Sequence, residues 1–260
     1  MLHEQLTHDI LGCCFEVHNE IGIGYPEAAY QAGLEAALAS AGIPFEAQVA
    51  LPVFAEGVKA HTFRTDFVVK NLIILELKSL ESDFARNDFI QLYSYLKAKP
   101  ARLGFLFNFG LERVVSERVI FDEKPVQIRE NWRYLGEAQR ESVDDLRTAL
   151  IDTAGDHGLG YGAETCRDLV RTMCRQRGMK LECAPMATAY FGEQPLGSHE
   201  LRCTVIDDRI VCTITALRDS VDSYQIARNQ SYLWSTGLPI GVHVNYGKET
   251  LHIHGVRAPK

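Results

Sequence analysis

The chain lacks the features of an exported or membrane-bound protein. Its first ten residues, MLHEQLTHDI, contain no basic segment followed by an apolar run, and no stretch reaches the length needed to cross a bilayer. CxxC pairs are absent, and the cysteines and histidines show no zinc-ligand spacing. The seven cysteines are therefore expected to be reduced thiols. We expect a cytoplasmic protein with no membrane partner.

Positive charge is also scarce. The 260 residues include 27 Lys and Arg against 34 Asp and Glu, which gives a formal net charge of −7. This balance argues against broad binding of nucleic acid through charge alone, because such binders are usually basic. A nuclease is not excluded, since a cluster of carboxylates stays acidic until cations bind to it. The hydrophobic fraction of 46% and the length allow one large domain or two smaller ones.

The two halves of the chain resemble each other. Short segments of the first half recur in the second at a nearly constant offset of 136 to 138 residues. The matching pairs are GIGY (22–25) and GLGY (158–161), AGI (41–43) and RGM (177–179), the segments beginning at Thr65 and Cys203, SYL (94–96) and SYL (231–233), and GFLFNFG (104–110) and GVHVNYG (241–247). Five collinear matches predict a tandem duplication. We place the first copy at residues 1–124, a linker at 125–140 and the second copy at 141–260.

The order of elements predicted for the first copy is typical of an α/β fold. A helix runs to about Asn19, and Pro26, favoured at the first helical position, opens a second helix that ends near Gly42. The remaining predicted elements are strands at about 45–54, 61–69 and 72–79, a helix at 84–98, and strands at 103–108 and 113–121. The predicted fold is a mixed sheet flanked by helices, present twice.

Two of these strands carry charged residues where a buried sheet is expected. The segment LIILELK (72–78) is strongly apolar, yet Glu76 and Lys78 must point to the same face because side chains alternate along a strand. Folding back from the preceding strand brings Asp66 to within about one position of facing Glu76. Such a patch must be neutralised internally or hold a cation, and oxygen ligands with spare charge suit Mg²⁺ or Mn²⁺. The alternative is a structural Asp66–Lys78 ion pair, with Glu76 reaching solvent at a sheet edge.

Further residues extend this pattern into a family motif. Gly24, Glu27 and Tyr30 in GYPEAAY precede Asp66 and Glu76-Leu77-Lys78, and Gln91 with Tyr95 follows in IQLYSYL. Together with the strand GFLFNFG, this set resembles the GxxExxY proteins, a branch of the PD-(D/E)XK nuclease superfamily, across residues 5–121.

The resemblance implies a restriction-endonuclease-like core with a metal centre. Asp66 and Glu76 would bind metal, Glu27 would join them from a helix, and Lys78 would assist the attacking water. Gln91 would face the site from the following helix. Two alternatives stay open: Glu27 stabilises a helix dipole, and Gln91 lies on an exposed helix face. The tyrosines of the motif are expected to serve packing.

The second copy departs from the motif at the charged positions. The offsets align Asp66 with Thr204, Glu76 with Ile214, Lys78 with Ala216 and Gln91 with Arg228. No metal site is therefore expected in this copy, and its His252 and His254 are taken as surface residues.

A helix of the second copy carries Arg167, Arg171 and Arg175 at a spacing of four residues. Residues at this spacing form one stripe, which we interpret as a contact for the phosphate backbone of nucleic acid. A solvated helix face is the alternative. The second copy could also serve as a built-in partner, which would make the protein a monomer with an internal pseudo-dimer.

The sequence thus favours metal-dependent hydrolysis of a phosphodiester bond in DNA or RNA by the first copy. Glu27, Asp66, Glu76, Lys78 and Gln91 are its predicted catalytic residues. The competing prediction is a binding or regulatory module that keeps the nuclease fold without its chemistry.

Overall fold

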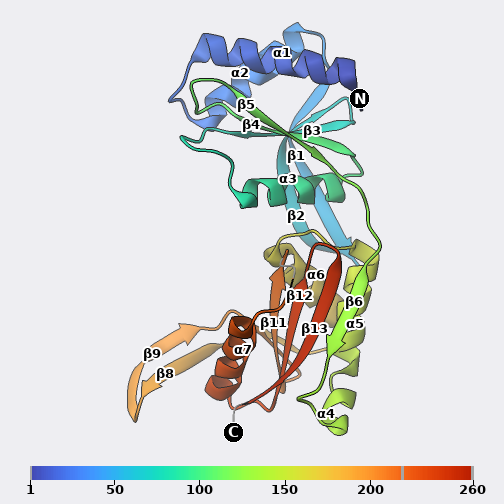
Figure 1. The fold of residues 1–260 in the computed structure, drawn as a ribbon, viewed down its shortest axis with the longest axis vertical. Helices are drawn as coiled ribbons and strands as arrows, with labels where there is room; N and C mark the ends of the chain where they lie inside the picture. Colours follow the sequence, from blue (N-terminus) through green and yellow to red (C-terminus); the bar gives the residue numbers. More distant parts are fainter. Residues whose placement is uncertain (1, 218–219, 259–260) are drawn as a thin grey trace. The chain divides into compact units, whose positions relative to one another are not determined.

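The computed structural model describes residues 2–217 and 220–258, and the chain divides into two compact units. The first contains the residues through Val53 together with Thr62–Asp122. The second contains Phe54–His61 and the residues from Glu123 onward. Each unit has its own mixed sheet flanked by helices, as the predicted fold class requires (Figure 1).

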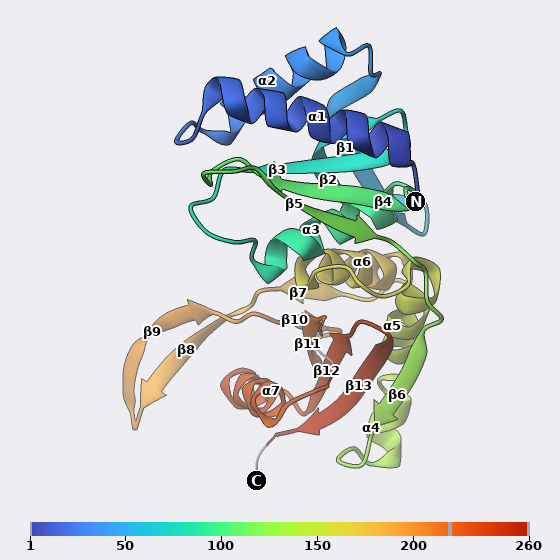
Figure 2. The ribbon, with the colours of Figure 1, turned by 45° about the horizontal axis from the view of Figure 1, so that its top comes forward.

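The first unit has a five-stranded sheet between two layers of helix. Strands follow the order β1-β2-β3-β4-β5, and β3 and β4 run parallel while β3 is antiparallel to β2 and β4 to β5. Helices α1 and α2 cover one face and α3 covers the other (Figures 1 and 2). The elements are α1 Glu4–Ile21, α2 Glu27–Ser40, β1 Phe45–Ala55, β2 Val58–Val69, β3 Ile73–Lys78, α3 Arg86–Ala98, β4 Leu103–Asn108 and β5 Val115–Ile120.

Strand β3 lies at the centre of this sheet and packs apolar side chains against the helices on both faces. Ile73, Leu75 and Leu77 are buried in the cluster formed with α1 and α2, whereas Ile74 packs with Leu92 of α3. Burying each of these side chains stabilises the fold by about 1.5–3 kcal/mol. The alternation sets Glu76 and Lys78 on the α3 face, where Ile74 also lies.

The second unit has a six-stranded sheet in the order β6-β13-β12-β11-β10-β7, and β8 and β9 form a separate two-stranded hairpin (Figure 2). The elements are β6 Gln127–Asn131, α4 Glu137–Glu141, α5 Asp144–His157, α6 Ala163–Gln176, β7 Leu181–Cys183, β8 Met186–Phe191, β9 Gln194–Glu200, β10 Thr204–Ile206, β11 Ile210–Ala216, α7 Ser223–Thr236, β12 Ile240–Tyr246 and β13 Thr250–Arg257. The stretch 125–140, predicted as a linker, contains β6, which pairs with β13 in this sheet.

Two further features concern the state of the cysteines and the character of the helices. All seven cysteines are free, and six of them are buried. Burial raises the pKa of the Cys174 and Cys203 thiols to about 12, so they behave as small apolar residues. Across residues 2–217 and 220–258, no helix combines the length and the apolar character needed to span a bilayer.

Candidate metal centre

A glycine-rich turn sets the start of α2 and with it Glu27. Gly24 has a φ of 90°, a conformation that residues with a Cβ rarely adopt. The buried Tyr30 closes the turn: its hydroxyl donates to the Gly22 carbonyl at 2.9 Å and accepts from the Tyr25 amide at 3.3 Å. The Tyr30 ring also stacks on Phe109, with centroids 5.0 Å apart. The GxxExxY spacing therefore has a structural basis, and the expected packing role of Tyr30 is confirmed.

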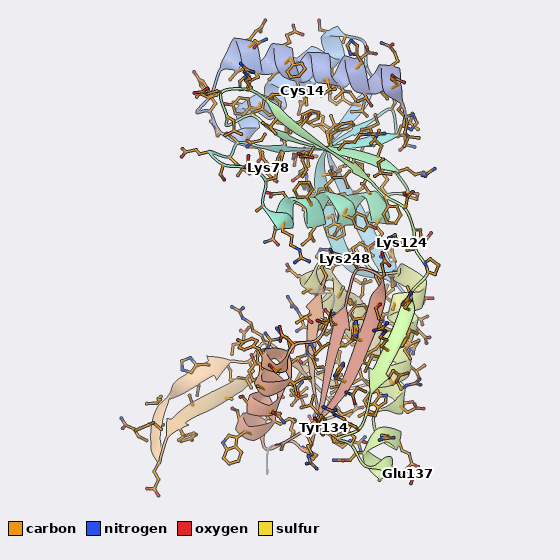
Figure 3. The ribbon with its side chains drawn as sticks, in the orientation of Figure 1. Cys14, Lys78, Lys124, Tyr134, Glu137 and Lys248 are labelled. Carbon is orange, nitrogen blue, oxygen red and sulfur yellow. The ribbon has the colours of Figure 1, made fainter. Side chains whose placement is uncertain are left out.

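Asp66 of β2 lies beside Glu76 near the end of β3, and Lys78 (labelled in Figure 3) follows Glu76 on the same face of the sheet. The Lys78 ammonium donates to Glu76 Oε1 at 2.6 Å. One oxygen of Asp66 accepts from the Leu77 amide at 2.7 Å. The two carboxylates are buried, with 8% of Asp66 and 2% of Glu76 exposed. The alternative of an Asp66–Lys78 pair with Glu76 in solvent is therefore wrong.

Glu27 interacts electrostatically with the cluster of Asp66, Glu76 and Lys78. Burial raises the pKa of Glu76 to about 8; the charge of Asp66 acts in the same direction, and Lys78 opposes it. Burial also raises the pKa of Glu27, which interacts with both Lys78 and Asp66. The pKa of Lys78 is raised because the carboxylates of Glu76, Glu27 and Asp66 outweigh its own burial. When all four groups are ionised, three carboxylates and one ammonium leave a net negative charge at the site.

Gln91 and Tyr95 approach the cluster from α3. The Gln91 amide donates to the Tyr95 hydroxyl at 2.6 Å, so its side chain is held rather than free on an exposed face. Burial raises the pKa of Tyr95, and the charges of Glu76, Asp66 and Glu27 raise it further. All five predicted catalytic residues are thereby brought to one region, with Gln91 linked to it through Tyr95.

The donor set fits a divalent cation. Glu76 Oε2 is buried and has no hydrogen-bond partner, a costly arrangement unless a cation or bound water completes it. Within the described ranges, however, no three His, Cys, Asp or Glu side chains already stand at ligand positions. Glu27, Asp66 and Glu76 supply the oxygen ligands that Mg²⁺ or Mn²⁺ prefers, but they would have to move closer together to hold the ion.

Two residues of the site were missed by the sequence analysis. Gln48, in β1, donates its side-chain amide to Asp66 Oδ1 at 3.1 Å. Asn108, fully buried at the end of β4, accepts from the Leu80 and Gly110 amides and donates to the Leu80 and Ser82 carbonyls, which fixes the loop after β3. For Asn108 a signal existed, because NFG at 108–110 recurs as NYG at 245–247.

The strand register of the second unit corrects the residue-by-residue alignment of the two copies that was predicted from the sequence. Asn245 lies opposite Thr215 in the parallel pair β11–β12, as Asn108 lies opposite Lys78 in β3–β4. Thr213 and Thr215, rather than Ile214 and Ala216, therefore correspond to Glu76 and Lys78. By the same reasoning Cys203 replaces Thr204 as the counterpart of Asp66, since Thr204 pairs with Cys212 as Phe67 pairs with Leu75. The predicted alignment was shifted by one residue. It therefore assigned counterparts whose side chains lie on the opposite face of the sheet.

Polar side chains without a carboxylate form a buried network at these positions of the second unit. Thr213 bonds to His243 at 2.9 Å and accepts from the Asn229 amide at 2.9 Å. The hydroxyl of Thr215 donates to Asn245 Oδ1 at 3.1 Å. The positions that match Asp66 and Glu76 hold Cys203 and Thr213 in place of carboxylates.

The arginine stripe on α6 is only partly open to solvent. Arg171 donates to the Thr204 hydroxyl at 3.1 Å and Arg175 to the Cys183 sulfur at 3.7 Å. Of the three arginines, Arg175 is exposed and Arg167 and Arg171 are half-buried. The expectation that His252 is a surface residue is wrong, because it is buried on the sheet opposite Asn245.

Comparison with known proteins agrees with the motif. Residues 4–119 match the PD-(D/E)XK nuclease superfamily. Among solved structures, the crystal structure of SSO0001 is similar at 21% identity and a TM-score of 0.29. That match covers 36% of this chain and 49% of the other, so it spans about half of the solved protein. No curated protein matches this chain.

Proposed function

Residues 4–119 form a domain of the PD-(D/E)XK nuclease superfamily, and we propose that this domain hydrolyses phosphodiester bonds in DNA or RNA with Mg²⁺ or Mn²⁺. The observation that carries the proposal is the buried Glu76, whose second oxygen lacks a partner beside Asp66 and Lys78. Buried carboxylates with perturbed pKa values are characteristic of functional sites.

Each residue of the site would have a distinct role in hydrolysis. Asp66 and Glu76, with Glu27 from α2, would hold the cation, which would polarise a phosphoryl oxygen and acidify a water molecule. Lys78 is half-buried and still partly open, so its ammonium could orient the attacking water and stabilise negative charge developing on the phosphate. Gln91 would hydrogen-bond to substrate or water while Tyr95 holds its amide.

We propose that the chain arose by tandem duplication, with copies at 1–124 and 141–260, and that the second copy is degenerate. Its role would be recognition of nucleic acid or formation of an internal pseudo-dimer, which would leave the protein monomeric. Contact with a phosphate backbone would fall chiefly to Arg175, because Arg171 is already bonded to Thr204 and Arg167 is half-buried.

Cleavage assays test the activity directly. Single- and double-stranded DNA and RNA would be incubated with Mn²⁺ and wild type, Glu76→Gln or the control Glu193→Gln, which removes the same charge from an exposed turn of the β8–β9 hairpin. We expect wild type and control to cut equally and Glu76→Gln to lose cutting. Equal cutting by all three proteins would show that the catalytic centre does not depend on Glu76.

A non-catalytic module remains the second candidate, because the three carboxylates do not stand at ligand positions in the described chain. No cutting by any variant, together with nucleic-acid or protein binding that survives Glu76→Gln, would favour it.

A further inference from the structure

Gln48 has an unusual backbone conformation for a residue within a strand. It lies in β1 with a φ of 52°, in the left-handed region that residues with a Cβ seldom occupy. Lys70 has a similar φ of 48°, but it lies in the exposed turn between β2 and β3, where this conformation is common. A strained residue inside a strand persists only where its surroundings hold it, and such residues cluster at functional sites.

The side chain of Gln48 explains what this conformation achieves. Its amide nitrogen donates to Asp66 Oδ1 at 3.1 Å and to Gln31 Oε1 at 2.8 Å, which uses both amide hydrogens. Gln31 in turn donates to Glu35 at 3.0 Å. The orientation of the Gln48 amide is therefore fixed from both sides.

Asp66 is consequently held at each of its oxygens. The Leu77 amide binds Oδ2 and the Gln48 amide binds Oδ1. Gln31 lies one helical turn after Glu27, so both side chains emerge from the same side of α2. The chain Gln31–Gln48–Asp66 thus connects the helix that carries one predicted ligand to the strand that carries another.

We propose that Gln48 is a positioning residue that orients Asp66 for the metal ion and sets its separation from the helix of Glu27. This inference rests on the proposed function. Partners of metal ligands fix ligand orientation, and their loss typically lowers metal affinity about 10- to 100-fold. The backbone strain at Gln48 would be the energetic cost of directing its amide at Asp66.

The test uses Gln48→Gly and the matched control Lys70→Gly. Each substitution relieves a left-handed backbone, but only the first removes a bond to Asp66. Mn²⁺ affinity would be measured by calorimetry, and melting temperature in the presence of a chelator. We expect Lys70→Gly to melt at or above the wild-type temperature and Gln48→Gly to melt near it, because the lost hydrogen bonds offset the relief of strain. Only Gln48→Gly should bind Mn²⁺ at least about tenfold more weakly.

Three other results are possible, and each would contradict either the positioning role of Gln48 or the metal centre itself. Equal Mn²⁺ affinity in wild type and Gln48→Gly would overturn the positioning role and leave the proposed metal centre intact. An equal loss in Lys70→Gly would also overturn it, because relief of strain alone would then explain the effect. Failure of wild type to bind Mn²⁺ would remove the proposed centre and this inference with it. Gln48→Ala, which keeps the Cβ, should lose affinity similarly but melt below Gln48→Gly.

Discussion

Replacing Glu76 with glutamine is expected to stabilise the metal-free protein even though it removes a predicted metal ligand. Glu76 is 2% exposed, and its pKa is raised to about 8 in the folded protein from 4.5 in the unfolded chain. Below pH 4.5 the carboxyl is protonated in both states. As pH rises toward 8, the unfolded chain ionises first, so the folded state loses stability.

The size of the effect follows from the pKa difference. Each pKa unit corresponds to about 1.4 kcal/mol, so the loss reaches roughly 3 kcal/mol by pH 7. Glutamine has no charge to lose, but it replaces the carboxyl oxygen that accepts a hydrogen bond from Lys78, which reduces the gain. We expect Glu76→Gln to be about 1–3 kcal/mol more stable than wild type at pH 7 and similar to it at pH 4.5.

Urea unfolding in the presence of a chelator, repeated from pH 4.5 to 8, measures this difference. Subtracting the two curves cancels the titration of the groups that do not interact with Glu76. A variant that is less stable than wild type at pH 7, or a difference independent of pH, would refute the burial argument. Added Mn²⁺ should then stabilise wild type but not Glu76→Gln, because only a folded state that binds the ion gains from it.

Three other perturbations have definite expectations. Tyr30→Phe removes the hydroxyl that closes the Gly22–Tyr25 turn and should cost about 1 kcal/mol in urea unfolding while weakening Mn²⁺ binding through Glu27. Asn108→Leu leaves the backbone of the loop after β3 without partners and should destabilise by about 2–4 kcal/mol, with faster amide exchange at Leu80. The buried cysteines should react with a thiol reagent only on unfolding, and fast labelling of more than one thiol in the native protein would contradict their burial.

The fold of the first unit was largely predictable because its signals are local. Apolar runs marked every strand, and Pro26 and Gly42 bracketed α2 within one or two residues of its observed ends. The period of two along β3 also placed Glu76 and Lys78 on one face. These features depend only on neighbours in sequence.

The remaining features depend on contacts that the sequence does not encode locally. The left-handed Gln48 has no distinctive neighbours, and its partners Gln31 and Asp66 lie 17 and 18 residues away. The error in the second copy arose because Val, Ile and Thr alternate there, and an apolar strand aligns almost equally well when shifted by one residue. The register with β12, anchored at Asn245, was needed to decide the face.

The most direct test of the proposed centre is a calorimetric Mn²⁺ titration of wild type and Glu76→Gln at pH 7.5, with Glu193→Gln as the charge-matched control. We expect wild type and Glu193→Gln to bind with the same affinity and Glu76→Gln to show no measurable binding. Equal binding by all three proteins would contradict a metal centre at Asp66 and Glu76.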